Sequence, residues 1–364
     1  MKPRLPPIPA AVWTALLALL AAWLLTWSSS GLASVAESSS DLVARSQALQ
    51  RAHQAVLGVQ VIALDGARSN ATLGRARSGS GVLIGADGLV LTIGYLVLEA
   101  EQVQLALGDG RSIPARVLGY DVATGFGLLQ ALAPLALQPV VIGSAASTGV
   151  GGTTLSSQPL MIASGGNAAE VSAAQLVSRR AFSGYWEYHI EGALFTAPPR
   201  RDHSGAGLFN PQGELIGIGS LLVADAAGAP TDADDDLRTR QSGNMFVPVD
   251  LLLPILDDLR RQGSSAASRR AWLGMNCVEQ AGGLRVVRVS DDSPADVAGL
   301  LPGDRILRID GTAVSALATL WQALWAGGAA EREVTLDIER DQQPQTLKVF
   351  SVDRMKTLRH AEGI

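Results

Sequence analysis

The sequence predicts a mainly β chain that begins with a transmembrane helix and ends with a small α+β module. Short apolar runs, each cut by Gly, Asp or Pro, recur at roughly 8–12-residue spacing from Val56 to about Val249, which is typical of a β-sandwich or β-barrel. A linker of small residues, Ser264–Ser268, then separates a unit of about 80–90 residues, the size of a small independent domain. A chain of 364 residues is long enough for two or three domains of roughly 100–200 residues each.

Composition and charge exclude several classes of protein. With 47% hydrophobic and 17% charged residues, the chain as a whole is neither disordered nor a coiled coil or collagen. Its 29 Lys and Arg against 34 Asp and Glu give a net charge of −5, so we expect no nucleic-acid partner. The single cysteine, Cys277, excludes an intramolecular disulfide and any metal site built on several cysteines. We interpret Cys277 as a small buried hydrophobic residue.

Residues 1–36 form a predicted membrane anchor or signal segment. Lys2 and Arg4 precede an uncharged, largely apolar run from Ala10 to Trp27. Its length of about 18 residues is closer to the about 20 of a spanning helix than to the about 7–15 of a signal peptide. We therefore expect residues 10–27 to cross a bacterial inner membrane once, with the rest of the chain in the periplasm. The alternative is cleavage after Ser34-Val35-Ala36, which would release the chain into the periplasm.

The middle of the chain is predicted to contain two helices with a series of β-strands between them. Residues 37–55 read as a polar linker helix with Ser40 as N-cap, which would space the body off the membrane. Val249–Gln262 predicts one further helix ended by Gly263. Between these helices, the β-type runs are 56–62, 81–84, 89–92, 103–107, 115–118 and 215–218.

The C-terminal module follows a linker at residues 263–270. Leu284–Val289 and Glu333–Glu339 alternate between apolar and polar residues like strands, Ser293-Pro294-Ala295 opens a short helix, and Leu317–Trp325 has the apolar spacing of a longer helix. A short tail, residues 353–364, ends the chain.

The stretch from Ser293-Pro294-Ala295 to Gly299-Leu300 and on to Gly303-Asp304 resembles the most diagnostic motif of bacterial-type PDZ domains, and the resemblance covers residues 271–352. It implies that Leu273-Gly274-Met275 is the turn whose backbone N–H groups bind the terminal carboxylate of a peptide. The adjoining strand would pair with the extended peptide, so the implied partners are protein C-termini and unfolded segments. The implied side-chain pocket is lined by Leu273, Met275, Leu317, Leu320 and Trp321. The competing expectation is that this module packs against the chain's own β body.

Three segments of the β body resemble the HtrA-type trypsin-like serine proteases, which carry a membrane anchor or signal, a double β-barrel and a C-terminal PDZ domain. The segments are Gly79–Val97, Leu107–Leu129 and Asp202–Gly217. The resemblance implies a trypsin-like double β-barrel over residues 56–262. Because the related proteases often form trimers through their barrels, it also implies a homo- or hetero-trimer.

The resemblance places the catalytic positions of the family on specific residues. Ser204 occupies the nucleophile position, but Tyr95 stands where the family has its histidine base and Gly125 where it has the orienting aspartate. A serine hydroxyl needs a neighbouring base, and a phenol with a pKa of about 10 is a poor one at neutral pH. In the loop that should form the oxyanion hole, Asp202 and His203 precede Ser204, and a carboxylate there would oppose a developing negative charge. We therefore interpret Ser204 as lacking a catalytic role.

Other candidate sites are weaker. The remaining histidines, His53, His189, His203 and His360, read as solvated or core residues rather than replacement bases. The acidic run 232–236 lacks the Gly and Glu of a calcium loop, and the glycines of 149–152 and 165–166 lack the features of a phosphate loop, so we expect no metal and no cofactor.

The sequence thus predicts a membrane-anchored periplasmic pseudoprotease that binds peptides as an adaptor, scaffold or regulator in envelope protein quality control. Two alternatives stay open. One is an active serine endopeptidase with a non-standard base, and the other is a structural subunit that assembles with catalytically complete paralogues.

Overall fold

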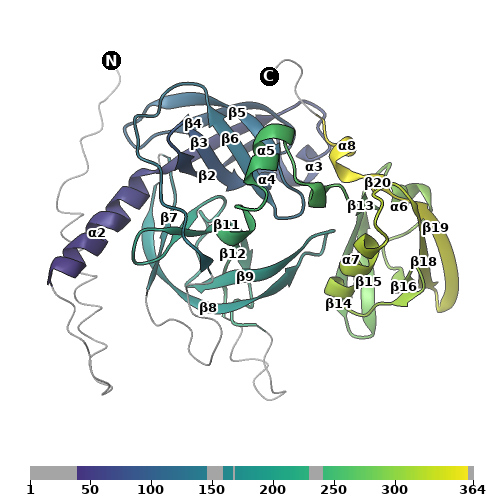
Figure 1. Cartoon of the computed structure of the whole chain (residues 1–364). Helices are drawn as coiled ribbons and strands as arrows, with labels where there is room; N and C mark the ends of the chain where they lie inside the picture. Colours follow the sequence, from purple (N-terminus) through teal and green to yellow (C-terminus); the bar gives the residue numbers. More distant parts are fainter. Residues whose placement is uncertain (1–38, 146–158, 167–168, 229–240, 360–364) are drawn as a thin grey trace, which may run out of the picture. The chain divides into compact units, whose positions relative to one another are not determined.

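A computed structural model of the chain describes residues 39–145, 159–166, 169–228 and 241–359. From Arg45 onward these residues belong to one compact unit, which contains two closed β-barrels and a C-terminal module (Figure 1). The predicted membrane segment at residues 10–27 lies outside the described ranges. Within those ranges, no helix combines the length and hydropathy that crossing a membrane would need.

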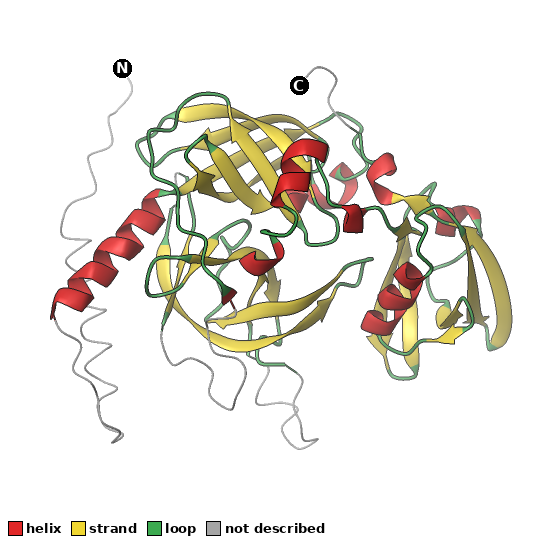
Figure 2. Ribbon diagram, in the orientation of Figure 1, coloured by secondary structure: helices red, strands yellow, loops and turns green. Residues whose placement is uncertain are grey.

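Helix α2 (Ser39–Gln54) is the predicted linker helix. It begins at Ser39, so Ser40 lies inside its first turn, and the prediction of Ser40 as N-cap is wrong. Apart from α2, the helices of the described residues are short and strands dominate, as Figure 2 shows.

The first barrel closes in the strand order β1-β2-β3-β6-β5-β4. Its strands are β1 (Val56–Ala63), β2 (Ala76–Gly85), β3 (Leu89–Ile93), β4 (Ala100–Ala106), β5 (Ser112–Tyr120) and β6 (Phe126–Ala131). All five residues of β3 are buried; four are apolar, and the hydroxyl of the fifth, Thr92, donates a hydrogen bond to the carbonyl oxygen of Ser80. Asp-Gly turns at Gly88 and Gly110, both with positive φ, connect β2 to β3 and β4 to β5. Two short helices, α3 (Asn70–Leu73) and α4 (Gly94–Val97), lie in the connections.

The second barrel closes in the order β10-β11-β12-β9-β8-β7. Its strands are β7 (Leu160–Ala163), β8 (Val171–Ser183), β9 (His189–Ala197), β10 (Gly207–Phe209), β11 (Leu215–Val223) and β12 (Gly243–Pro248). Strands β8 and β9 form a long antiparallel hairpin with two register shifts. One hydrophobic cluster includes Phe126 of the first barrel and Phe195 of the second, so the two barrels share a core.

The segment after β12 differs from its prediction. Instead of one helix over 249–262, the chain forms the 3₁₀ turn Val249–Leu251 and then α5 (Leu256–Gln262). Pro254 lies in the interruption; it has no N–H to donate and disfavours a helical conformation at the residue before it. The predicted end of the helix is confirmed, because Gly263 caps α5 in the left-handed conformation.

The C-terminal module contains a sheet in the order β14-β15-β16-β18-β19, with β17 on β16, and a separate two-stranded pair, β13 and β20. Its strands are β13 (Ala271–Trp272), β14 (Met275–Gln280), β15 (Gly283–Val289), β16 (Arg305–Ile309), β17 (Thr312–Ala313), β18 (Glu333–Arg340), β19 (Gln343–Phe350) and β20 (Val352–Asp353). Its helices are α6 (Pro294–Val297), α7 (Leu317–Ala326) and α8 (Arg354–Thr357). The predicted start of α6 is confirmed, since the Ser293 hydroxyl accepts a hydrogen bond from the N–H of Asp296. The module has its own buried core, with Trp321 as its largest side chain.

The linker before the module is held to the first barrel by Asp121. This buried carboxylate accepts hydrogen bonds from the N–H of Ser265 at 3.1 Å and from the Ser268 hydroxyl at 2.5 Å. A short 3₁₀ turn, Ala266–Ser268, presents these groups. The linker is therefore a fixed connection rather than a free spacer.

Candidate functional site

Tyr95 and Ser204 are brought together by the two barrels. Tyr95 lies in α4, the single helical turn that follows the buried strand β3, and Ser204 lies in the loop between β9 and β10. The loop fits closely against β2, because the N–H of Ser80 donates to the carbonyl oxygen of Ser204 at 2.8 Å. Gly205 allows this approach: its φ is +73°, and a Cβ there would lie 1.9 Å from the carbonyl oxygen of Ser80.

The Tyr95 hydroxyl lies 2.7 Å from Ser204 Oγ and 2.9 Å from the carbonyl oxygen of Ser220. A carbonyl oxygen only accepts, whereas a tyrosine hydroxyl has one proton to donate. The arrangement that satisfies both contacts has Tyr95 donating to Ser220 and Ser204 donating to the phenolic oxygen. In this arrangement the proton of Ser204 faces an oxygen that already carries a proton of its own.

Burial raises the pKa of Tyr95 to about 12, although the hydrogen bond with Ser204 works in the opposite direction. At pH 7 only about one molecule in 10⁵ would then carry a phenolate. Tyr95 therefore has even less of the deprotonated form that could accept the serine proton than an exposed phenol has at the same pH.

Gly125, at the predicted orienter position, has a backbone conformation that disfavours any other residue. Its φ is +84°, and a Cβ there would lie 3.0 Å from the hydroxyl of Tyr188. Its carbonyl oxygen accepts a hydrogen bond at 2.7 Å from the N–H of Gly94, the residue before Tyr95. The Tyr188 hydroxyl in turn donates to the carbonyl oxygen of Thr124 at 2.7 Å. The space that a side chain at position 125 would enter is thus bounded by Tyr188.

Asp202 is paired rather than isolated. Its carboxylate accepts hydrogen bonds from Arg200, with Nε at 2.9 Å, and from the Ser164 hydroxyl. Burial alone would raise the pKa of Asp202, but the hydrogen bonds and the charge of Arg200 outweigh it and lower the pKa below its ordinary value. The expected negative charge in this loop is therefore present, but the Arg200 guanidinium, whose side chain is 8% exposed, neutralises it.

The predicted peptide-binding turn of the C-terminal module already holds a carboxylate from this chain. The backbone N–H groups of Leu273, Gly274 and Met275 lie 3.0, 2.8 and 3.3 Å from Oε1 of Glu187, which belongs to the loop between β8 and β9. Gly274 has a φ of +86°, and a Cβ there would lie 2.3 Å from Cβ of Ser293. Only glycine fits this turn without rearrangement.

The predicted pocket residues are mostly part of the module's core. Leu273, Met275, Leu320 and Trp321 are fully buried, and Leu317 at the start of α7 is half-buried against the same cluster. The indole N–H of Trp321 donates to the carbonyl oxygen of Gly184 at 2.9 Å, in the loop that carries Glu187.

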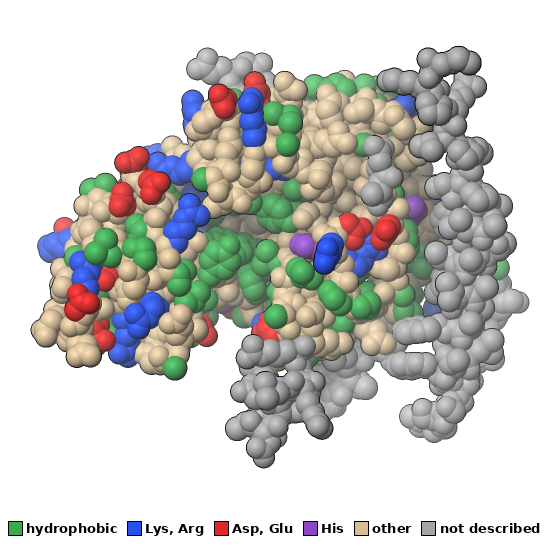
Figure 3. All heavy atoms as spheres, turned by 180° about the vertical axis from the view of Figure 1, so that it is seen from behind, with side chains coloured by type: hydrophobic (Ala, Val, Ile, Leu, Met, Phe, Trp, Pro, Cys, Tyr) green, Lys and Arg blue, Asp and Glu red, His purple; other side chains and the backbone are tan. Residues whose placement is uncertain are grey.

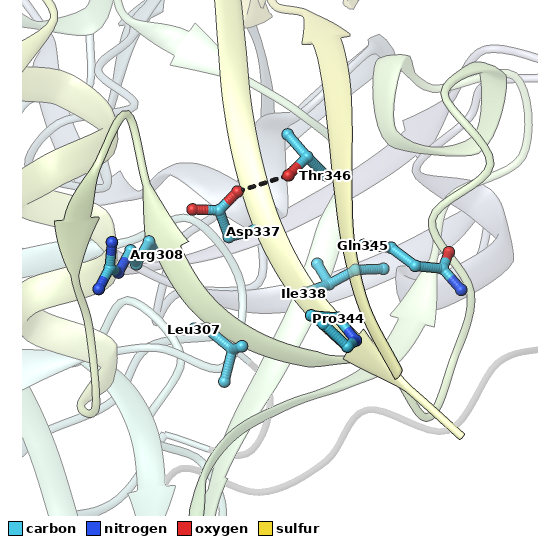
Figure 4. A pocket seen from close by; sticks show the side chains of 7 residues that line it. All are labelled: Leu307, Arg308, Asp337, Ile338, Pro344, Gln345 and Thr346. Atoms are coloured by element: carbon cyan, nitrogen blue, oxygen red, sulfur yellow. Dashed lines mark hydrogen bonds between the residues drawn. The ribbon is translucent and has the colours of Figure 1, made fainter. Parts of the chain in front are cut away.

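A separate shallow hollow of about 320 Å³ lies on the other strands of the module (Figure 4). Its one carboxylate, Asp337, accepts a hydrogen bond from Thr346 at 2.8 Å, and the two side chains point toward each other in the figure. The residues around it are Leu307, Arg308, Asp337, Ile338, Pro344, Gln345 and Thr346. None of these residues belongs to the turn that binds Glu187 or to helix α7, so this hollow is not the predicted peptide site.

Comparisons with known proteins match both halves of the described unit. Residues 79–218 match the family model of a trypsin-like peptidase domain, and residues 271–350 match that of a PDZ domain. The serine endoprotease DegS of Escherichia coli strain K12 is 27% identical over 316 residues, covering 83% of this chain and 84% of DegS. The chain is an HtrA-type serine protease homologue with a C-terminal PDZ domain.

Two further relatives of this HtrA-type chain differ in coverage. A probable periplasmic serine endoprotease, DegP-like, of Ectopseudomonas mendocina is 28% identical over 284 residues, covering 74% of this chain. The chain spans 55% of that relative's length. A variant of the HtrA-type protease AlgW solved with a tripeptide is 22% identical with a TM-score of 0.50, covering 87% of this chain and 99% of that one, a likeness that shows the fold.

His189 and His203 have hydrogen-bond partners other than Ser204. Nδ1 of His203 lies 2.9 Å from the carbonyl oxygen of Arg200, and burial lowers the pKa of His203 despite the opposing effects of that carbonyl and of Asp202. His189 contacts Ser183 at 2.8 Å and Gln322 of α7 at 3.2 Å. Burial also lowers the pKa of His53, and His360 lies outside the described residues.

The described ranges contain no group of three or more His, Cys, Asp or Glu side chains placed to hold a metal ion. The acidic run 232–236 and the glycines of 149–152 lie outside the ranges. Cys277 is buried in the PDZ domain, and burial raises the pKa of its thiol. On the face of the molecule in Figure 3, Lys and Arg side chains are interspersed with Asp and Glu rather than gathered into one patch.

Four residues of the site were not found by sequence reasoning: Glu187, Tyr188, Arg200 and Ser220. A weak signal existed for Glu187, because a carboxylate set among Tyr185, Trp186 and Tyr188 is unlike a solvated acidic loop. Its partners lie 86 to 88 residues away along the chain, so no local pattern identifies them.

Proposed function

We propose that this chain is a catalytically inactive HtrA-type protein of the bacterial envelope that binds peptide segments as an adaptor, scaffold or regulator of protein quality control. The observation that carries the proposal is the contact between Tyr95 and Ser204 at 2.7 Å. The matched relatives are named as serine endoproteases, one of them periplasmic, which supports the compartment and the class of partner.

The chemistry of peptide hydrolysis supports inactivity. Attack on a carbonyl carbon requires a base that removes the serine proton, and a second group that orients the base. The hydroxyl that contacts Ser204 Oγ belongs to the half-buried Tyr95, and burial raises its pKa to about 12. Gly125 has no side chain with which to orient a base, and the nearby hydroxyl of Tyr188 leaves little room for a side chain at this position.

The PDZ domain supports peptide binding. Its turn at Leu273-Gly274-Met275 presents three converging N–H groups to a carboxylate, which is the recognition that a peptide C-terminus requires. Strand β14 follows directly and can pair with an extended chain. Apolar residues of β14 and α7 adjoin this turn and favour Val, Leu, Ile or Phe as the last residue of the partner.

The location in the cell is part of the proposal. Residues 10–27 would anchor the chain in the inner membrane and leave the barrels and the PDZ domain in the periplasm. Mass spectrometry of the N-terminus tests the anchor: a retained N-terminus supports it, and a mature chain that starts near Glu37 contradicts it.

Inactivity is tested with a fluorophosphonate probe and with casein as an unfolded substrate. The full chain in detergent, its Ser204→Ala variant and an active HtrA-type protease are compared side by side. We expect no labelling of Ser204 and equal casein turnover by the wild type and Ser204→Ala. Labelling or turnover that disappears in Ser204→Ala would overturn the proposal in favour of an endopeptidase with a non-standard base.

A further inference from the structure

The tip of the β8–β9 hairpin, residues Gly184–Glu187, contacts all three parts of the PDZ peptide groove. These parts are the carboxylate-binding turn, the strand β14 and the helix α7. Each contact is a hydrogen bond between the hairpin tip and one of these three parts.

The carboxylate-binding turn is filled by Glu187. Oε1 accepts from the N–H groups of Leu273, Gly274 and Met275, and Oε2 lies 3.8 Å from the guanidinium of Arg354. The Glu187 side chain is 4% exposed. A carboxylate this deeply buried needs several donors, and this one takes those that a terminal carboxylate of a bound peptide would use.

The strand β14 is engaged by the backbone of the same tip. The N–H of Cys277 donates to the carbonyl oxygen of Tyr185 at 2.6 Å. The residues of the tip and their partners on the PDZ domain follow one another in opposite directions along the chain. Tyr185 contacts Cys277, and Glu187, which comes later in the tip, contacts the earlier residues 273–275. The tip is thus antiparallel to the start of the domain's strand, as a peptide added to a sheet edge can be.

The helix α7 closes the other side. The indole N–H of Trp321 donates to the carbonyl oxygen of Gly184 at 2.9 Å, and the Trp321 side chain is fully buried. The apolar wall predicted to select the last residue of a peptide is therefore covered by the chain itself.

The tip is held ready for this contact by its aromatic residues. Trp186 stacks on Tyr188 with ring centroids 5.7 Å apart and meets the ring of Tyr185 edge-on at 4.8 Å. Tyr188 is fixed to the first barrel through its hydrogen bond to Thr124. A tip ordered in this way loses little conformational freedom when it enters the groove.

We propose that the hairpin tip is an internal ligand of the PDZ domain, with Glu187 in place of a peptide's terminal carboxylate. A partner C-terminus binds only when the tip leaves, so the apparent affinity for a peptide is the intrinsic affinity reduced by the open fraction. Because the tip belongs to the same chain, its effective concentration at the groove is high. A free peptide competes with the tip only when the peptide concentration in solution is high enough. The peptide part of this inference rests on the function proposed above, whereas the occupancy of the groove does not.

The test compares the full chain in detergent with Glu187→Ala and Glu187→Gln. Glu191→Gln is the matched control, because Glu191 lies on the same hairpin with a side chain 73% exposed. Hydrogen exchange followed by mass spectrometry reports on the amides of 273–277, which Glu187 and Tyr185 protect. Fluorescence polarisation measures binding of a labelled random peptide pool with a free C-terminal Leu, and of the same pool amidated.

We expect exchange at 273–277 to be about tenfold faster in both Glu187 variants than in the wild type and in Glu191→Gln. We also expect the free-carboxyl pool to bind about tenfold more tightly to the Glu187 variants, with amidation removing the gain. Unchanged exchange in folded Glu187 variants would overturn the internal ligand. Faster exchange without binding of the peptide pool by any variant would support the internal ligand and contradict the proposed peptide binding.

Discussion

The hydroxyl of Tyr95 lies 2.7 Å from the hydroxyl of Ser204 and 2.9 Å from the carbonyl oxygen of Ser220. The pair joins a helical turn of the first barrel to the loop before β10 of the second. The serine predicted to occupy the nucleophile position therefore takes part in a structural contact between the two barrels.

This contact predicts that Ser204→Ala destabilises the protein. We expect Ser204→Ala to lower the free energy of unfolding by about 1 kcal/mol, and Tyr95→Phe by about 1–2 kcal/mol because it also leaves the Ser220 carbonyl without its donor. Urea unfolding of both single variants and the double variant gives their coupling energy. Tyr185→Phe, at an exposed ring, is the control and should change stability by less than about 0.5 kcal/mol. A coupling energy of zero would show that the hydrogen bond contributes nothing.

Gly125→Asp is predicted to destabilise the chain rather than restore a triad. The φ of +84° is unfavourable for any L side chain, and the new Cβ would lie 3.0 Å from the Tyr188 hydroxyl. We expect a loss of about 1–3 kcal/mol in the free energy of unfolding for Gly125→Asp and a similar loss for Gly125→Ala. Gly108→Ala is the matched control, since nothing lies within 4 Å of its added Cβ. Equal urea midpoints for the Gly125 and Gly108 variants would refute the strain argument.

Asp202→Asn is predicted to lower the free energy of unfolding more than an Asp→Asn change at an exposed ion pair does. It removes the charge that neutralises Arg200, whose side chain is 8% exposed, while the Asp202 side chain itself is 36% exposed. We expect about 2 kcal/mol of lost stability, below the value for a fully buried pair. Asp109→Asn breaks the exposed pair with Arg111 and should lower stability much less than Asp202→Asn does. A smaller loss at Asp202 than at Asp109 would contradict the structural role of Arg200.

The hydrogen bonds that the Asp121 carboxylate accepts predict that the protein loses stability in acid. Burial would raise the pKa of Asp121, but the hydrogen bonds from Ser265, Ser268 and Thr124 outweigh it and lower the pKa below its ordinary value. Because the folded-state pKa is the lower one, the stabilisation is complete above the unfolded value and is lost as the pH falls through the folded value. We expect Asp121→Asn to lose about 2 kcal/mol at pH 7. The difference between the two proteins should shrink as urea unfolding is repeated toward pH 3, and a difference that grows would be inconsistent with this sign.

Local patterns in the sequence were sufficient for part of the elements, including five of the six strands of the first barrel. The β-type runs of the first barrel, the helix at Leu317 and the capped turn at Ser293 each depend on residues a few positions apart, and each lies where it was predicted. The single helix predicted over 249–262 was wrong because one residue, Pro254, outweighed an otherwise helical composition. The order of strands around each barrel was available only through the family resemblance, since periodicity carries no information about pairing.

The sequence by itself determined that a glycine-containing turn begins the PDZ domain, and its resemblance to the family predicts that Tyr95, Gly125 and Ser204 stand at the catalytic positions. Only the tertiary structure decided what these residues contact. Tyr95 meets a serine 109 positions away, and Gly274 meets Glu187 87 positions away. The physical reason is that a hydrogen bond or an ion pair depends on distance in space, which the packing of distant strands sets, whereas sequence patterns report only on neighbours within a strand or a helical turn.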